Sequence, residues 1–312
     1  MLLGFVTNQR RRINQISPFY MTKTLSTSEF AKALGISESS VRRMTDSGDL
    51  QIHRTRGGHR RIPVPEAIRY VRETKAPVMQ PEMFGLVIDP SEVTVDSAEE
   101  KMLGVLKNGH AAAVTSLMQS LYASGIGIAE ICDGPIAFAM REIGDAWPHD
   151  KKAIFIEHRA VILCCRALNQ LRLSVPEPEA DAPQAIGGAM TGDVYLMPTL
   201  MASLVLHELG YNETNLGPNL PLDVLTDCVI DESPELVWLS ISEPIRSRTQ
   251  GLEVAKLAEA AEALGSRLIV GGRYSADLDP TGGSHPSTIR WCATMRDLEA
   301  IAKEAMTRRN RR

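Results

Sequence analysis

Residues 26–44 read STSEFAKALGISESSVRRM, and this stretch decides the fold of the first part of the chain. Ser26 and Glu29 have the spacing of a capping box, in which each side chain accepts a hydrogen bond from the backbone of the other residue, and apolar residues follow at helical spacing. Gly35 ends this helix, and Ser37 can cap a second one. Two short helices joined by so tight a turn predict a helix-turn-helix.

The second helix and the segment behind it carry the side chains that are expected to meet DNA. Val41 and Met44 share the inward face of this helix, so its other face, rich in serine and arginine, can meet bases and phosphates. Residues 56–62 then place two glycines among basic residues, which predicts a wing whose backbone can approach a phosphate closely. The predicted DNA-binding residues are Ser39, Ser40, Arg42, Arg43, Arg56, Gly57, Gly58, His59, Arg60 and Arg61.

The charge of the chain is distributed unevenly along the sequence. Residues 1–75 contain 14 Lys and Arg against 6 Asp and Glu, whereas the remainder contains 20 against 32. A basic end on an otherwise acidic chain is typical of a protein that meets a polyanion at one end only. Double-stranded DNA, in the form of an operator, is therefore the expected partner. The alternative is that the arginines merely form a solvated surface.

The run ALGISESSVRRM and the sequence GGHRRI behind it resemble the DNA-binding domain of MerR-type transcriptional regulators. The resemblance covers about residues 24–74 and implies a winged helix-turn-helix domain, which we place at residues 24–75. The same fold serves phage excisionases, but an excisionase has no large C-terminal domain. Since a single head of this type contacts only one half-site, the resemblance also implies a homo-oligomer.

A second domain is predicted at residues 90–175, where apolar residues recur every three or four positions and a four-helix bundle is the simplest packing. The expected helices are 97–107, 111–123, 127–145 and 152–173. The last of these looks apolar nearly all round, so Glu157 and His158 within it are expected to be buried. A buried carboxylate beside an imidazole more often marks a site. An ordinary hydrogen-bonded couple is the alternative.

From residue 183 to residue 308 apolar strands alternate with helices, which predicts a doubly wound parallel sheet and makes the whole chain an α+β multidomain protein. Ligands of such sheets lie at the carboxyl ends of the strands. The candidate ligand-binding residues there are Asp193, Tyr195, Gly217, Pro218, Ser240, Ser242, Gly271 and Gly272. Five cysteines without paired spacing favour reduced thiols over disulfides or a zinc site.

A second resemblance rests on Trp147, followed after nine residues by Glu157 and His158, and on a sheet domain with LGPNLP after its second strand and Gly-Gly after its fourth. These features resemble a cobalamin-binding module. With the head, the arrangement resembles light- or cobalamin-responsive repressors of carotenoid genes, the CarA/CarH/LitR type, in which the tryptophan and the Glu-His pair cap the upper face of the corrinoid. In that family a histidine after the first strand binds cobalt from below. Tyr195 stands at that position here, and Pro198 replaces a glycine.

The missing histidine leaves three hypotheses, because a phenol with an ordinary pKa of about 10 is a poor ligand for cobalt at neutral pH. The first is a DNA-binding repressor whose module senses a tetrapyrrole, either cobalamin with His158 as its sole imidazole ligand, or a haem or bilin in place of cobalamin. The second is a regulator whose module has lost its ligand and serves only dimerisation or partner binding. The third, a corrinoid carrier for methyl transfer, needs the histidine and no DNA-binding head, so no enzyme activity is expected.

Because no apolar run is long enough to cross a bilayer, we expect no membrane association and a cytoplasmic protein.

Overall fold

The computed structural model describes residues 23–145, 151–245, 247–278 and 289–309. The contacts within the chain divide it into two compact units, Met1–Gly85 and Leu86–Arg312. We call the first the head and the second the C-terminal unit, and each is described by itself. No helix in the described part of the chain is both long enough and apolar enough to cross a lipid bilayer.

The head is a small sheet covered by helices. Its three strands are antiparallel in the order β1-β3-β2. Strand β1 occupies the three residues before the first helix and was not predicted, since so short a strand exists only through its pairing with β3. The elements of the head are β1 (Thr24–Ser26), α2 (Thr27–Leu34), α3 (Glu38–Ser47), β2 (His53–Arg54), β3 (Arg60–Pro63), α4 (Val64–Thr74) and the 3-10 turn η2 (Pro81–Phe84).

The predicted capping box is confirmed at the start of α2. The backbone N–H of Glu29 donates to Oγ of Ser26 over 3.1 Å, and the backbone N–H of Ser26 donates to Oε2 of Glu29 over 2.7 Å. Gly35 ends the helix with a φ of 68°. Ser37 caps α3 by accepting the backbone N–H of Ser40 over 3.1 Å. Local sequence therefore sets both boundaries of the helix-turn-helix.

The C-terminal unit begins with a helical bundle close to the one expected. Its elements are α5 (Val95–Asn108), α6 (Ala111–Ser124), α7 (Ile128–Ile131), η3 (Cys132–Ile136), α8 (Ala137–Gly144) and α9 (Lys151–Arg172). One difference is that the third expected helix is interrupted by η3, a π-helical turn that contains Pro135. Because proline has no backbone N–H and its ring clashes with the preceding turn, a regular α-helix cannot continue through this position.

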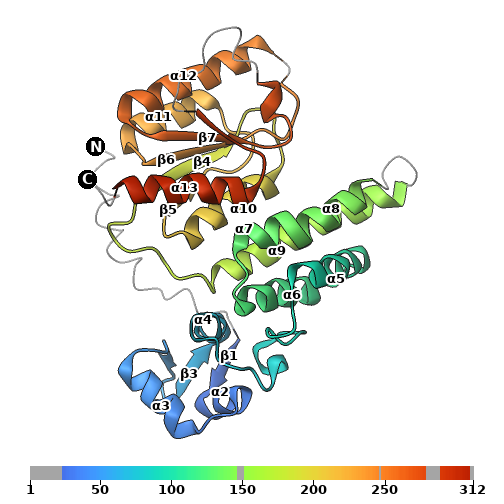
Figure 1. Ribbon diagram of the computed structural model, residues 1–312, viewed down its shortest axis with the longest axis vertical. Helices are drawn as coiled ribbons and strands as arrows, with labels where there is room; N and C mark the ends of the chain where they lie inside the picture. The colour runs from blue at the N-terminus through green and yellow to red at the C-terminus, as the bar shows by residue number, and fades with distance from the viewer. Residues whose placement is uncertain (1–22, 146–150, 246, 279–288, 310–312) are drawn as a thin grey trace. The chain divides into compact units, whose positions relative to one another are not determined.

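The rest of the unit is a five-stranded parallel sheet in the order β5-β4-β6-β7-β8. Helices α11 and α12 cover one face of this sheet, and α10 and α13 cover the other (Figure 1). Strand β8 was not predicted, because only one residue in its short sequence IRWC is buried. The elements are β4 (Gln184–Ala189), α10 (Leu196–Glu208), β5 (Asn212–Asn215), α11 (Leu222–Glu232), β6 (Leu236–Ser240), α12 (Arg248–Leu264), β7 (Arg267–Gly271), η5 (Ser275–Asp277), β8 (Ile289–Cys292) and α13 (Met295–Arg309).

Two carboxylates join the bundle to the sheet, and each caps a helix of the other part of the unit. Glu208, at the end of α10, accepts the backbone N–H of Ile128 at the start of α7 over 2.8 Å. In the opposite sense, Asp133 of the bundle accepts the backbone N–H groups of Met295 and Arg296 at the start of α13, each over 2.9 Å. Because unpaired N–H groups at a helix start favour a negative charge, these contacts fix the position of the bundle on the sheet.

Candidate functional site

The first candidate site is the polar face of α3. Val41 is fully buried against the rest of the head, and Arg42 and Arg43 are exposed on the opposite side of the helix. Arg42 makes a 2.9 Å ion pair with Glu38, one turn earlier. Arg43 donates from Nη2 to Oγ of Ser40 over 3.4 Å. Both arginines therefore remain at the surface, as the sequence predicts for a recognition helix.

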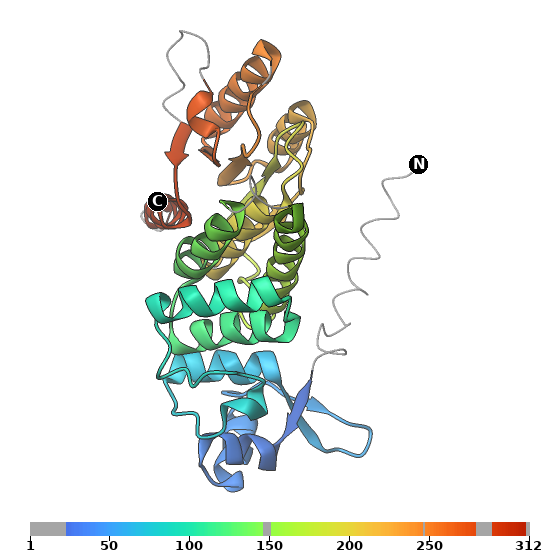
Figure 2. The same ribbon diagram turned by 90° about the vertical axis from the view of Figure 1, so that its right-hand side faces the viewer.

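The wing is the hairpin formed by β2 and β3, which projects from the head in Figure 2. The carbonyl of Thr55 accepts the N–H of Gly58 over 2.8 Å, and the N–H of Thr55 donates to the carbonyl of His59 over 3.0 Å. Gly58 has a φ of 79°, a left-handed conformation that favours glycine. Arg56, Gly57 and His59 are exposed along the loop, where the predicted phosphate contacts would lie.

The two arginines that open β3 point in different directions. Arg60 is only 24% exposed and makes a 2.5 Å ion pair with Asp46, near the end of α3. Arg61 lies 4.0 Å from Glu29 on α2 and is more exposed. The sequence predicts the same role for both arginines, but in the structure Arg61 is the more exposed of the two, with 42% of its side chain accessible against 24% for Arg60.

The expectation that Glu157 and His158 are buried is wrong, since the side chain of Glu157 is only partly buried, at 20% exposed, and that of His158 is exposed. The side chain of His158 is 73% exposed, and Phe155 and Ile162 on the same side of α9 are each 59% exposed. The reason is that α9 packs one face against the bundle and leaves these side chains on the other. Apolar residues on the outer face made the helix look buried all round. Trp147 lies outside the described residues.

The second candidate site is the loop after β4, at the carboxyl edge of the sheet. Asp193 in this loop is completely buried. Its Oδ1 accepts the N–H of Tyr195 over 3.0 Å, and its Oδ2 accepts the N–H of Ser242, in the loop after β6, over 2.5 Å. Burial nevertheless raises the pKa of this carboxyl above its ordinary value. Asp193 thus holds two loops of the edge together.

Tyr195 stands at the position where the sequence resemblance predicts a cobalt ligand. Burial raises the pKa of its phenol, and the nearby carboxylates of Glu243, Glu157 and Asp193 raise it further. Glu157 belongs to the bundle and the other two belong to the sheet, so carboxylates approach this phenol from both parts of the unit. Since a phenol binds a metal as the phenolate, the raised pKa disfavours Tyr195 as a metal ligand.

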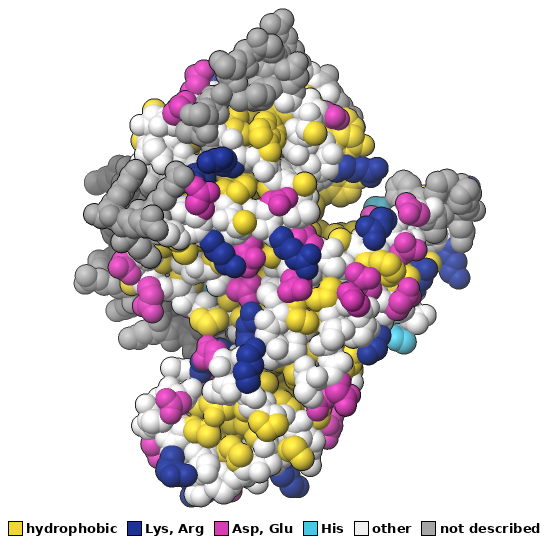
Figure 3. All heavy atoms as spheres, viewed as in Figure 1, with side chains coloured by type: hydrophobic (Ala, Val, Ile, Leu, Met, Phe, Trp, Pro, Cys, Tyr) yellow, Lys and Arg dark blue, Asp and Glu magenta, His cyan; other side chains and the backbone are white. Residues whose placement is uncertain are grey.

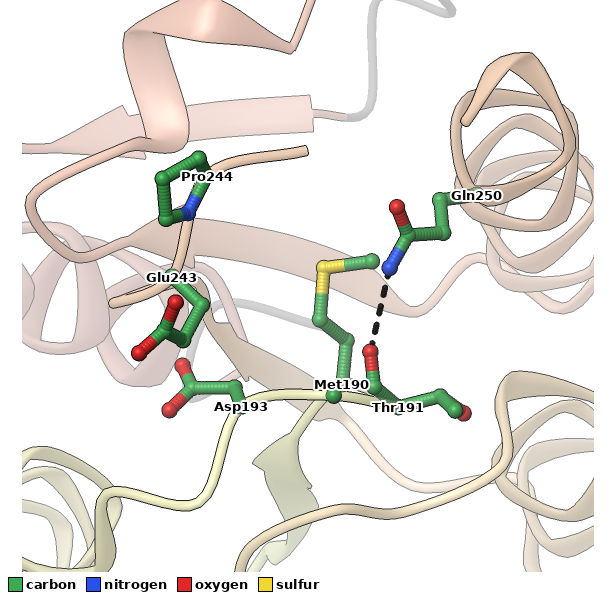
Figure 4. Close-up of a pocket in the computed structure, with 7 residues that line it drawn as sticks. Met190, Thr191, Asp193, Glu243, Pro244 and Gln250 are labelled. Carbon is green, nitrogen blue, oxygen red and sulfur yellow. Dashed lines mark hydrogen bonds between the residues drawn. The ribbon is translucent and has the colours of Figure 1, made fainter. Parts of the chain in front are cut away.

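The space at this edge is small near the loops and more open toward the bundle. A pocket of about 60 Å³ is lined by Met190, Thr191, Gly192, Asp193, Glu243, Pro244 and Gln250. Figure 4 shows the carboxylates of Asp193 and Glu243 on one side of the pocket, and Gln250 donating to the carbonyl of Thr191 over 3.1 Å on the other. Figure 3 shows a broader hollow between the sheet and the arm formed by α8 and α9.

The other predicted ligand residues lie in the loops of the same edge. Pro218 is exposed, and Oγ of Ser240 lies 3.4 Å from Oγ of Ser242. Gly272 has a φ of 105°, and a Cβ at this position would lie 2.5 Å from the carbonyl oxygen of Ile241. A Cβ at Gly271 would lie 2.6 Å from Sγ of Cys292. The close packing of the loops is therefore sufficient by itself to require glycine at both positions. Gly217, with a φ of 82°, is required by its turn.

Behind the loop, the interior between the sheet and α10 is occupied by side chains that the sequence did not single out. The indole Nε1 of Trp238 donates to Oγ1 of Thr199 over 3.0 Å, and Thr199 donates to Oδ1 of Asn215 over 3.0 Å. The indole lies against Gly187, where a Cβ would come within 2.2 Å of it. The sequence does carry one signal that could have indicated this polar interior, namely a polar residue at every fourth position of α10. The residues with this spacing are Thr199, Ser203 and His207.

A histidine-ligated cobalamin does not fit these residues. Tyr195 offers the cobalt no imidazole, the raised pKa of its phenol disfavours the phenolate, and Trp238 occupies the interior behind the loop. Among the described residues, no three His, Cys, Asp or Glu side chains are grouped so that they could hold a metal ion. His158 remains a candidate ligand on the bundle side, because its imidazole is 73% exposed.

The comparisons with known proteins agree with both parts of this description. The model of a helix-turn-helix domain family matches residues 24–73. The monomethylamine corrinoid protein of Methanosarcina barkeri resembles the chain with a TM-score of 0.50 and 14% identity, over 68% of this chain and 100% of that one. The chain thus combines a helix-turn-helix head with a helical bundle and a parallel sheet that match the fold of cobalamin-binding proteins.

Two further solved structures share 14% identity with the chain over 68% of its length. A novel cobalamin-binding protein from Desulfitobacterium hafniense DCB-2 is covered to 98% with a TM-score of 0.36. The methanol:cobalamin methyltransferase complex MtaBC from Methanosarcina barkeri is covered to 80% with a TM-score of 0.33. No curated protein matches the sequence.

Proposed function

We propose that the chain is a DNA-binding transcriptional regulator of the MerR type, acting as a repressor, and that its C-terminal unit responds to a signal. The observation that carries this proposal is the head, in which a capped recognition helix and a wing both expose arginines. The net positive charge of residues 1–75 supports an anionic partner. Regulation, and no catalytic activity, is the role we propose for the whole chain.

DNA binding is tested by selecting duplexes from a random-sequence library with the full chain and measuring the affinity of the selected duplex at several salt concentrations. We expect two half-sites, because the proposed regulator binds as a homo-oligomer, and an affinity that falls steeply with salt. A chain that enriches no duplex would overturn the proposal. Repression is tested separately with a reporter gene placed behind the selected site.

For the C-terminal unit we propose a flat tetrapyrrole as the signal, bound in the hollow between α9 and the sheet edge without a ligand from the sheet. Glu157 and Tyr195 approach each other across this space. Ile154, Val194 and Leu196 expose apolar side chains on the same two segments. Such a surface favours a large apolar ligand over a solvated gap. A haem held by His158, or a bilin, suits these residues better than a cobalamin that needs a histidine below the ring.

A second candidate function is favoured by the small pocket and the filled interior. Only about 60 Å³ is open beside Asp193, and Trp238 is packed behind the loop, so the interior at this edge is already filled by side chains of the chain itself. Under this alternative the C-terminal unit serves only for dimerisation or for binding a protein partner, and Phe155 and Ile162 are part of the contact surface.

The two candidates are separated by incubating the full chain with aquocobalamin, haem or biliverdin, removing the free compound by gel filtration and recording a visible spectrum. We expect a retained chromophore whose spectrum changes in His158→Ala. The matched control is His110→Ala, since His110 is also exposed but lies at the start of α6. If none of the three compounds is retained, the effector proposal fails and the second candidate stands.

A further inference from the structure

The adjacent residues Arg60 and Arg61 are directed to opposite faces of β3. Successive side chains of a strand alternate between its faces, so Arg60 shares a face with Ile62, whose side chain is fully buried. Arg61 is on the other face, opposite Ser26 of β1 and His53 of β2 in the antiparallel register. A motif of two consecutive arginines therefore provides one side chain for the interior side of the wing and one for its outer side.

The inward direction of Arg60 brings it to the end of the recognition helix. Its Nη2 lies 2.5 Å from Oδ1 of Asp46, in the last turn of α3. A cation at this place is also favoured by the partial negative charge of the helix C-terminus. Nε of Arg60 is buried and has no hydrogen-bond partner among the described residues. The guanidinium is thus partly desolvated where it pairs with Asp46, whereas the side chain of Asp46 is 60% exposed.

We propose that Arg60 is a positioning residue, which fixes the wing relative to α3 through Asp46, and that it does not contact a DNA phosphate. The proposal rests on the DNA-binding function proposed above. Recognition helix and wing must contact the DNA at the same time, and the Arg60–Asp46 pair is a charged contact that joins them. Arg56, exposed at the tip of the wing, is left as a side chain for phosphate contact.

The two roles predict opposite effects of Asp46→Asn. If Arg60 positions the wing, the loss of its partner releases the wing and weakens DNA binding. If Arg60 instead contacts a phosphate, the loss of Asp46 frees the guanidinium and removes a negative charge near the DNA, so binding tightens. A matched control for the charge is Glu82→Gln, which removes one exposed carboxylate from the head at the turn η2, away from α3 and the wing.

The experiment measures the affinity of the full chain for its selected duplex between about 50 and 200 mM salt, where each phosphate contact contributes about 0.9 to the slope of log K against log salt. We compare the wild type with Asp46→Asn, Arg60→Gln, the double variant and Arg56→Ala. Asp46→Asn and Arg60→Gln should each weaken binding about three- to fivefold, the range expected for loss of a partly exposed ion pair. Their slopes should stay unchanged, and the double variant should be no weaker than either single one. Arg56→Ala should lower the slope by about 0.9.

The proposal is overturned by tighter binding in Asp46→Asn, or by a slope reduced by about 0.9 in Arg60→Gln. Additive losses in the double variant would also overturn it, because two residues that act through one contact cannot be independent. Thermal unfolding of each variant shows whether the head is folded, and Asp46→Asn, at an exposed site, provides a folded variant if Arg60→Gln does not. If the wild-type chain itself binds no duplex, the DNA-binding function proposed above fails, and this outcome is distinct from a failure of the role proposed for Arg60.

Discussion

Replacing Glu213 with glutamine tests how the C-terminal unit is held together. Glu213, on the edge strand β5, has a side chain that is only 5% exposed. Its Oε1 accepts Nε and Nη2 of Arg172 over 3.2 and 3.0 Å, and its Oε2 lies 3.0 Å from Nδ1 of His207. Arg172 ends the last helix of the bundle, and the other two residues belong to the sheet. The cluster therefore joins the two parts of the unit.

The size of the effect follows from these contacts. Removing one partner of a buried ion pair costs about 3–5 kcal/mol, because the remaining charge is left without compensation. Glutamine keeps the shape of the glutamate side chain and one of its two oxygen acceptors. Arg172 is 34% exposed, so water can solvate part of the guanidinium charge. We therefore expect Glu213→Gln to lower the free energy of unfolding by about 1.5–3 kcal/mol at neutral pH.

The loss should also depend on pH in a defined direction. Burial alone would raise the pKa of Glu213, but its hydrogen bond with His207 and the charges of His207 and Arg172 hold it below the ordinary value of 4.5. A carboxyl whose pKa is lower in the folded state stabilises the fold above its ordinary pKa and loses this contribution as the pH falls. The difference between wild type and variant should thus be fully present above about pH 4.5 and shrink as the pH falls below that value.

Urea unfolding followed by tryptophan fluorescence measures this difference, since Trp238 is buried beside α10 in the same unit. Glu177→Gln is the matched control, because Glu177 is the more exposed carboxylate, 3.5 Å from the same Arg172. It should change the stability by less than about 0.5 kcal/mol. A loss below about 1 kcal/mol in Glu213→Gln, or one that does not vary with pH, would refute the role assigned to the cluster.

Two other predictions concern the sheet edge and the joint with the bundle. Tyr195→His provides an imidazole at the position of the missing ligand but leaves Trp238 in the interior behind the loop, so the visible spectrum of added aquocobalamin should stay unchanged; a changed spectrum would show that an imidazole at position 195 reaches the cobalt despite Trp238. Asp133→Ala leaves two N–H groups at the start of α13 without their acceptor and should lower the free energy of unfolding by about 1–2 kcal/mol in urea titrations. Glu100→Ala, at an exposed position of α5, serves as the control for Asp133→Ala. Equal stability of these two variants would contradict the capping role of Asp133.

Much of the fold was predictable because its signals are local. The capping box at Ser26 and Glu29, the left-handed Gly35 and the cap at Ser37 act within a few residues of themselves, so they specify the head without knowledge of its packing. The alternation of apolar strands and helices likewise predicts the parallel sheet. Strands β1 and β8 escaped prediction because a short strand is stabilised by its neighbours in the sheet and carries little pattern of its own.

The candidate sites depended more on three-dimensional packing. The apolar residues around His158 predicted burial, but the pattern could not show that α9 leaves its outer face uncovered. The pair of arginines in the wing suggested one role for both, and the alternation of β3 separates them. The network of Trp238, Thr199 and Asn215 joins residues that are far apart in sequence, and such contacts leave only a weak trace in the sequence.

The sequence by itself determined that this protein has a winged helix-turn-helix head, and it identified Tyr195 as the departure from the cobalamin-binding pattern. Both are statements about residue type and spacing. The tertiary structure alone decided that carboxylates from the bundle and the sheet surround this phenol, and that Arg60 is turned to Asp46 while Arg61 faces outward. The physical reason is that burial and the charge environment of a side chain depend on elements distant in sequence, which only the folded chain brings together.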